Sequence, residues 1–269
     1  HVHVDDATRE IHCDYNNTLL RNTVQQCLPV QHLYLFHWAL YLLLKLDLDL
    51  FLNLKMRRGA LVVFEGCDRS GKSTQCKKLV ESMQQKGMKA ELMRFPERST
   101  VIGKLIDSYL KNSKDVQDNA IHLLFSANRW ELKPEMERKL NEGVTLVVDR
   151  YAYSGVAFTA AKEGISLNWC KRPDVGLPLP DLVLFLKVSS EAAEKRGGFG
   201  EERYEKSEIQ ARVAKNFEKL QENDWEIINA DQSMEDVQKQ IQNVVSNLMN
   251  QDLPELGKLW TEQDSNLKM

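Results

Sequence analysis

The octapeptide Gly66–Ser73, with the sequence GCDRSGKS, constrains the fold of this chain more than any other feature. It matches the pattern G-x-x-x-x-G-K-[ST], follows the apolar run Leu61–Phe64 and opens a stretch with helical periodicity. Its glycines allow backbone N–H groups to converge on phosphate oxygens, and the helix start adds a positive dipole end. Lys72 supplies a point charge and Ser73 a hydroxyl for Mg²⁺. The pattern predicts a phosphate loop for ATP or GTP; a glycine-rich turn without function is the alternative.

Two positions that the pattern leaves free carry opposite charges, Asp68 and Arg69. A carboxylate beside phosphate is unfavourable unless it faces a sugar hydroxyl or a cation on a second substrate. A guanidinium at Arg69 could bridge donor and acceptor phosphates and neutralise the charge that develops during phosphoryl transfer. The alternative is that Asp68 and Arg69 simply pair with each other or with other surface residues.

Length and composition indicate one catalytic domain. The chain has 269 residues, 42% of them hydrophobic, and a net charge of −3. This suffices for one α/β core and argues against a nucleic-acid partner. Five cysteines without a C-x-x-C pair predict neither a disulfide framework nor a zinc site, and they fit a reducing compartment. Cys67 lies inside the phosphate loop, but nothing in the sequence indicates a lowered thiol pKa.

Residues 1–55 differ from the remainder, because they contain no glycine and hold five of the six histidines. Their apolar stretch Leu33–Leu44 is too short for a membrane span. Acidic residues outnumber basic ones ahead of it, which disfavours a secretory or mitochondrial leader. We interpret residues 1–55 as a disordered or non-native extension, residues 56–262 as the folded domain and residues 263–269 as a polar tail, with no membrane association.

From residue 60 onward, short apolar runs alternate with longer stretches of helical periodicity, which predicts a parallel sheet of five strands flanked by helices. The expected strands are Leu61–Phe64, Glu91–Phe95, Val144–Val148, Leu182–Val188 and Trp225–Ile228. The expected helices are Lys72–Gln85, Val101–Leu110, Asn119–Asn141, Ala152–Glu163, Glu208–Gln221 and Met234–Met249. A glycine-rich loop follows the fourth strand at residues 196–200.

Arginines follow the predicted strands at the edge where an α/β sheet binds its ligands. Arg98 comes after the second strand, Arg150 after the third, and Arg129 lies on a predicted helix. Together with Arg69 they exceed what one triphosphate with a lysine and Mg²⁺ needs. We therefore expect a second anionic substrate and phosphoryl transfer between two nucleotides.

Two further features carry both a functional and a structural interpretation. Asp149 ends an apolar strand, where a carboxylate can hold Mg²⁺ beside the phosphate loop or cap the next helix. Phe125 and Arg129 lie four residues apart and share one helix face, so they could stack on a base and bind its edge. The alternative for Phe125 is an ordinary core position.

Five segments carry a family resemblance: Cys67–Thr74, Arg94–Arg98, His122–Trp130, Asp149–Gly155 and Glu202–Glu205. They resemble the eukaryotic thymidylate kinases, members of the P-loop nucleoside monophosphate kinase superfamily. The resemblance implies a three-layer P-loop NTPase fold with a short lid at about residues 195–208. It also implies ATP-dependent, Mg²⁺-dependent phosphorylation of dTMP to dTDP in dTTP biosynthesis. A homodimer is implied as well, placed in the cytoplasm with the nucleus left open and mitochondria disfavoured.

The resemblance assigns site residues by position. The implied ATP site comprises Gly66, Asp68, Arg69, Ser70, Gly71, Lys72, Ser73, Thr74 and Arg196. The implied dTMP site comprises Asp68, Phe95, Arg98, Phe125, Arg129, Arg150, Ser154, Gly155, Phe158, Tyr204 and Gln210. The implied catalytic residues are Arg69, Lys72, Asp149 and Arg150, and the implied Mg²⁺ ligands are Ser73 and Asp149.

Within these sets, Asp68 is expected to accept the deoxyribose hydroxyl, and Tyr204 with Gln210 to close over the nucleoside. We expect in-line transfer without a general base, since the attacking phosphate is already anionic. Two alternatives stay open: a related kinase acting on dUMP, dCMP or a deoxynucleoside, and a nucleotide-binding protein that has lost turnover.

Overall fold

The computed structural model describes residues 2–4, 11–13, 57–196 and 202–261. The chain divides into two units, residues 1–55 and 56–269. In the first unit, β1 (Val2–Val4) pairs antiparallel with β2 (Ile11–Cys13), two short strands that the sequence pattern does not predict. The remainder of the expected extension, the tail at 263–269 and lid residues 197–201 lie outside the described residues.

The second unit contains a five-stranded parallel sheet with the order β4-β5-β3-β6-β7. Its strands are β3 (Leu61–Glu65), β4 (Ala90–Arg94), β5 (Thr145–Asp149), β6 (Leu182–Lys187) and β7 (Glu226–Asn229). All residues of β3 and β5 are buried, as expected for central strands covered on both faces. The predicted number and location of the strands in this unit are confirmed, with bounds that differ by at most one residue at either end.

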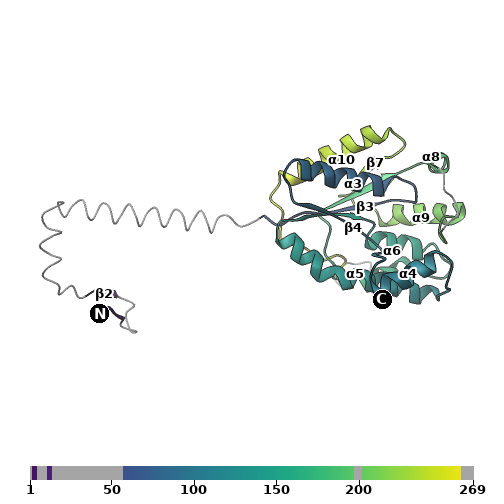
Figure 1. Ribbon diagram of the computed structural model, residues 1–269. Coiled ribbons are helices and arrows are strands. Elements are labelled where there is room, and N and C mark those ends of the chain that lie inside the picture. Colours follow the sequence, from purple (N-terminus) through teal and green to yellow (C-terminus); the bar gives the residue numbers. More distant parts are fainter. Residues whose placement is uncertain (1, 5–10, 14–56, 197–201, 262–269) are drawn as a thin grey trace, which may run out of the picture. The chain divides into compact units, whose positions relative to one another are not determined.

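Helices of the second unit flank this sheet (Figure 1). They are α3 (Lys72–Gln85), α4 (Val101–Leu110), α5 (Asp118–Asn141), α6 (Ala152–Thr159), α7 (Leu167–Lys171), α8 (Ser190–Lys195), α9 (Ser207–Leu220) and α10 (Met234–Met249). A 3₁₀ helix, η1, covers Arg172–Asp174. Helix α6 ends four residues earlier than predicted, and the sequence pattern missed α7, η1 and α8 because such short helices contain too few turns for a periodicity.

Alternation along β3 separates two hydrophobic cores. Leu61 and Val63 face a cluster that includes residues of α5, α6 and α9, whereas Val62 and Phe64 face a cluster built with α3 and α10. Figure 1 shows the corresponding layers, with α3 and α10 on one side of the sheet and α5 and α6 on the other. Consecutive strand residues point to opposite faces, so a strand covered by helices on both sides is apolar throughout.

The strand order places β3 at the centre, between β5 and β6, so the chain segments that follow β3 and β5 emerge side by side. Parallel strands present their carboxyl ends at one edge, which is where such sheets bind ligands. No helix among the described residues is both long and apolar enough to cross a membrane.

Candidate active site

The phosphate loop connects β3 to α3 and has a backbone that favours glycine. Gly66 and Gly71 have φ angles of 141° and 90°, and a Cβ at Gly66 would lie 2.6 Å from the carbonyl oxygen of Leu186. Lys72 Nζ donates hydrogen bonds to Cys67 O at 2.6 Å and Ser70 Oγ at 3.1 Å. Burial, together with the positive charge of the nearby Arg150, lowers the pKa of Lys72 to about 8. A phosphate anion in the loop would restore a favourable environment for this charge.

A cavity of about 420 Å³ opens beside the loop and gathers most of the predicted site residues. Those that line it are Asp68, Arg69, Gly71, Lys72, Ser73, Thr74, Phe95, Arg98, Phe125, Arg129, Asp149, Arg150, Ser154, Gly155, Phe158 and Tyr204. Four predicted residues do not line it: Gly66, Ser70, Arg196 and Gln210. Arg196 instead donates hydrogen bonds to the carbonyl oxygens of Arg69 and Ala230, on the outer side of the loop.

Arg150 is held between both halves of the site. Its Nη2 forms an ion pair with Asp68, and its Nη1 donates to Gly66 O at 3.2 Å and to Ser154 Oγ at 3.1 Å. Arg150 has a φ of 70°, a left-handed conformation that is uncommon for a non-glycine residue. The guanidinium of Arg150 also lies over the ring of Phe158, with its Cζ 5.1 Å from the centroid.

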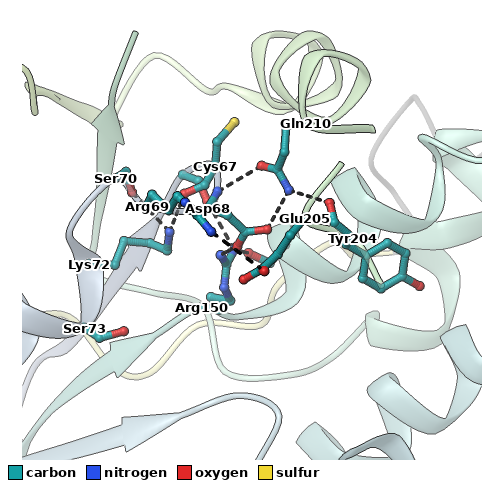
Figure 2. A network of polar contacts seen from close by, with 12 residues as sticks. Cys67, Asp68, Arg69, Ser70, Lys72, Ser73, Arg150, Tyr204, Glu205 and Gln210 are labelled. Atoms are coloured by element: carbon teal, nitrogen blue, oxygen red, sulfur yellow. Dashed lines mark hydrogen bonds and ion pairs between the residues drawn. The ribbon is translucent and has the colours of Figure 1, made fainter. Parts of the chain in front are cut away.

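Gln210 binds the phosphate loop and lines a second, smaller pocket beside it. Its Oε1 accepts a hydrogen bond from the backbone N–H of Asp68 at 3.0 Å, and its Nε2 donates to the Asp68 carboxylate and to Tyr204 O. Figure 2 shows Asp68 between Arg150 and Gln210. The structure therefore gives Gln210 a contact that sequence reasoning did not foresee, and its expected place over the nucleoside stays a prediction.

Carboxylates of the lid face two of the other arginines. Arg98 Nη1 lies 2.7 Å from Asp107 Oδ1 and 2.8 Å from Oε1 of Glu202, which belongs to the lid. Arg69 Nη2 lies 3.8 Å from Glu205 Oε2, also in the lid. These two arginines, which are predicted to act on phosphate groups, thus already face acidic side chains that an anionic substrate would compete with.

Arg129 forms a buried ion pair with Asp174 of η1. Its Nε donates to Asp174 Oδ1 at 3.1 Å and its Nη2 to Oδ2 at 2.6 Å, and the two residues are 2% and 0% exposed. Ser126 Oγ donates to the same carboxylate at 2.7 Å. A Cβ at Gly155 would lie 2.9 Å from Arg129 Nη2, so only glycine fits there without displacing the guanidinium. Asp174 is a site residue that sequence reasoning missed.

Aromatic rings wall the cavity. Phe158 and Tyr204 contact edge to face with centroids 5.5 Å apart, and Phe95 packs against Tyr151 at 5.7 Å. Phe125 lines the cavity and also packs against the cluster that contains Ile106 and Ile121. The two interpretations of Phe125 are therefore compatible, because one ring face can contact the core while the other borders the pocket.

Ser73 and Asp149 meet at the carboxyl end of the sheet, where Ser73 Oγ donates a hydrogen bond to Asp149 Oδ2. Asp149 does not cap α6, because the N-cap residue is Tyr151 and Glu65 Oε1 accepts the hydrogen bonds from the backbone N–H groups of Tyr151 and Ser154. The described residues contain no group of three or more His, Cys, Asp or Glu side chains arranged to hold a metal. Mg²⁺ usually takes one or two protein oxygens together with substrate phosphates and water, so this pair fits the ion.

Cys67 shows no sign of a reactive thiolate. Burial raises the pKa of its thiol above the ordinary value, and the positive charges of Lys72 and Arg150 offset this only in part. The thiol is therefore protonated at neutral pH, which reduces its susceptibility to oxidation.

Comparison with known proteins places this geometry in a family. A family model described as thymidylate kinase matches residues 64–241, which include the phosphate loop, all the cavity arginines and α9. The chain belongs to the thymidylate kinase family. This confirms the resemblance that the five sequence segments indicated.

Three curated thymidylate kinases align with this chain over nearly their full length. The protein from Homo sapiens is 55% identical over 208 residues, 76% of this chain and 98% of the relative. Those from Danio rerio and Schizosaccharomyces pombe are each 53% identical, with 98% and 95% of their lengths covered. A solved thymidylate kinase structure from Candida albicans superposes with a TM-score of 0.70 at 37% identity, covering 76% of this chain and 99% of its own.

Proposed function

We propose that this protein transfers the γ-phosphoryl group of ATP to dTMP, giving ADP and dTDP for dTTP biosynthesis. The observation that carries the proposal is the cavity, which is lined by five arginines beside an intact phosphate loop. Donor phosphates with Mg²⁺ and Lys72 would not require so many cations, whereas two nucleotides would. Membership of the thymidylate kinase family supports dTMP as the acceptor.

On the donor side, the loop N–H groups, Lys72 and Thr74 hold the triphosphate, and Ser73 with Asp149 would hold Mg²⁺. The ion, when bound, would neutralise charge on the donor phosphates. Arg196 supports the loop from outside, since it donates to Arg69 O. In this role it positions the donor site without lining the cavity.

On the acceptor side, Arg98 and Arg150 bind the dTMP phosphate, and Asp68 accepts the sugar hydroxyl. Phe125 stacks on the base, with Phe95 and Phe158 as neighbouring walls. Some N–H groups of Arg129 do not bind Asp174, and Arg129 presents them to the edge of the base. Such donors suit a carbonyl oxygen of the base. Ser154 and Gly155 form the floor, and Tyr204 closes the nucleoside side.

Catalysis rests on positioning and charge neutralisation. An oxygen of the dTMP phosphate attacks the γ-phosphorus in line, the bond to the β–γ bridging oxygen breaks, and ADP leaves. Arg69 and Arg150 stabilise the transferring group from the two halves of the site. The side chains of the lid exclude water that would otherwise hydrolyse ATP.

We also infer a homodimer from the family resemblance. From the cysteine pattern, which fits a reducing compartment, we infer that the protein works in the cytoplasm, with the nucleus as the second location. Sedimentation equilibrium of the purified chain tests the first inference, and a sedimenting mass of a single chain would contradict it. Microscopy of the tagged protein in its own cells tests the second.

A coupled ADP-release assay with dTMP, dUMP, dCMP and AMP as acceptors tests the function. We expect kcat/KM to be highest with dTMP and lowest with dCMP and AMP, whose exocyclic amino groups would face the donors of Arg129. Preference for dCMP or AMP would overturn the choice of acceptor. ATP binding without turnover of any acceptor would instead support the non-catalytic alternative, although Lys72, Ser73, Asp149 and Arg150 are all present.

A further inference from the structure

Glu65 is a fully buried carboxylate at the end of β3, immediately before the phosphate loop. Its Oε1 accepts hydrogen bonds from the backbone N–H groups of Tyr151 at 2.9 Å and Ser154 at 3.0 Å. Its Oε2 accepts a hydrogen bond from Ser154 Oγ. A single side chain on the donor strand therefore holds the segment that carries the acceptor-side residues.

The direction of the Ser154 hydrogen bond has a consequence for Arg150. A hydroxyl carries one proton, and Ser154 donates it to Glu65, so its oxygen presents only lone pairs to its other neighbours. Arg150 Nη1 donates to those lone pairs at 3.1 Å and to Gly66 O at 3.2 Å. Glu65, Ser154 and Arg150 thus form a chain of hydrogen bonds with a fixed polarity.

The ionised form of Glu65 is the one that fits these contacts, because all three neighbours at its oxygens are donors. Burial raises the pKa of Glu65, while the Ser154 hydroxyl and the charge of Arg150 act in the opposite direction. A protonated Glu65 would donate to Ser154 and release the hydroxyl proton toward Arg150, where two donors would meet.

We propose that Glu65 is a positioning residue of the phosphoryl-transfer site, which fixes the Ser154 hydroxyl as an acceptor and thereby aims Arg150 at the acceptor phosphate. The proposal rests on the role that the proposed function gives to Arg150. It also explains how the two half sites stay in register, since one buried side chain links the donor strand to the start of α6. A carboxylate that only capped α6 would need the hydrogen bonds from the backbone N–H groups of Tyr151 and Ser154, but not the one from the Ser154 hydroxyl.

Glu65→Gln separates these two roles. The amide oxygen can keep both backbone hydrogen bonds, so the cap of α6 survives, whereas the amide nitrogen must donate to Ser154 and reverse the hydroxyl. Steady-state kinetics should show KM for dTMP raised about tenfold or more and kcat lowered, with KM for ATP within about twofold of the parent. Unchanged KM for dTMP and unchanged kcat in a folded Glu65→Gln protein would overturn the proposal.

Ser154→Ala and the double variant complete a cycle. Ser154→Ala removes one of the three acceptors of Arg150 and should raise KM for dTMP by several-fold. The double variant has no Ser154 hydroxyl whose direction could be reversed. Its increase in KM for dTMP should therefore be no greater than that of Glu65→Gln alone. If the fold-increase in KM for dTMP of the double variant equals the product of the two single-variant increases, Glu65 and Ser154 act independently. This result would also overturn the proposal.

Ser233→Ala serves as the matched control, because it removes the side-chain cap of α10 and touches none of these residues. It should lower the thermal midpoint and leave KM for dTMP unchanged. If Glu65→Gln does not fold, Ser154→Ala decides alone, and an unchanged KM there contradicts the proposal. Calorimetric titration with dTMP separates the two hypotheses: a parent protein that binds dTMP without turnover refutes the proposed function, while unaltered dTMP affinity in the folded variants refutes the role of Glu65.

Discussion

The donor and acceptor halves of the site are built in different ways. In the donor loop, Lys72 finds its partners Cys67 and Ser70 only five and two residues away in the sequence. On the acceptor side, Arg129 pairs with a carboxylate 45 residues away and Arg150 with one 82 residues away. The donor site is a local structure, and the acceptor site exists only once the sheet has assembled.

This difference predicts that the donor half tolerates substitutions in its surroundings better than the acceptor half. A loop held by its own backbone keeps its shape wherever a strand and a helix flank it. A guanidinium held by a distant carboxylate depends on the packing of two elements, and removing the carboxylate leaves an unpaired buried charge. Substitutions near the acceptor arginines should therefore weaken the binding of dTMP more than the binding of ATP.

Arg69→Ala should give the largest effect and test where the two halves meet. Arg69 lies in the donor loop by sequence, yet its guanidinium faces the lid residue Glu205 across the cavity. We expect kcat to fall by about 10³-fold or more, with smaller changes in either KM, because the charge it neutralises develops during transfer. A rise in KM for ATP with kcat retained would assign Arg69 to the donor half alone.

Asp174→Asn should give the next largest effect, confined to the acceptor half. Loss of the carboxylate leaves Arg129 without its fixed orientation, so KM for dTMP should rise by about 10-fold to 100-fold while KM for ATP changes little. The preference for dTMP over dCMP should narrow in the same assay.

A matched control is Asp181→Asn, which breaks the comparable ion pair with Arg58 at the other end of β3. It should lower the free energy of unfolding measured with urea and leave the acceptor preference intact. Equal kinetic effects of Asp174→Asn and Asp181→Asn would reduce Asp174 to a purely structural residue.

Glu202→Gln should lower KM for dTMP, in contrast to Asp174→Asn, and the change should be smaller. Its carboxylate competes with the dTMP phosphate for Arg98, and both side chains are about one-third exposed. We expect KM for dTMP to fall about twofold to fivefold, with a smaller effect at high salt. Glu191→Gln, which removes an exposed pair with Lys195 on α8, is the control and should change nothing. A raised KM in Glu202→Gln would instead make the carboxylate part of the acceptor site.

The smallest effect should appear as a pH dependence of stability. His122 Nε2 donates to Cys170 O at 2.8 Å, and its Nδ1 lies within hydrogen-bond distance of Thr159 Oγ1 at 2.9 Å. Burial lowers the pKa of His122 below its ordinary value of 6.5. Below about pH 6.5 the unfolded chain therefore binds more protons, and the free energy of unfolding falls as the pH decreases. Urea titrations at pH 7 and 5.5 should show a smaller fall in His122→Gln than in the parent.

The contrast between the halves also marks how far the sequence could predict the structure. The phosphate loop, the five strands of the second unit and the bounds of α3, α4 and α10 follow from local patterns. Glu65 and Asp174 do not, because a carboxylate at a strand end or in a proline-flanked turn has no spacing that distinguishes it from a surface residue. Only the fold shows that Asp174 lies against Arg129.

Gln210 is a residue that the sequence identifies but whose contacts the sequence does not predict. The family resemblance selects the residue, but its hydrogen bonds to the backbone and the carboxylate of Asp68 depend on how α9 packs beside the loop. Asp149 is a simpler case. Its sequence position fits either a Mg²⁺ ligand or a cap of the next helix, and only the second interpretation requires a hydrogen bond to the start of α6. The structure removes the helix-capping interpretation, because Glu65 occupies the start of α6.

Tyr153, next to Ser154 on α6, contacts two indole rings edge on, Trp225 at 4.7 Å and Trp260 at 5.3 Å between centroids. The emission of these tryptophans therefore reports on the environment of the helix that carries the acceptor floor. A rotation or loosening of α6 would change their exposure and quenching without any attached dye. The protein thus contains its own optical probe, and stopped-flow fluorescence tests whether substrate binding changes the packing of α6.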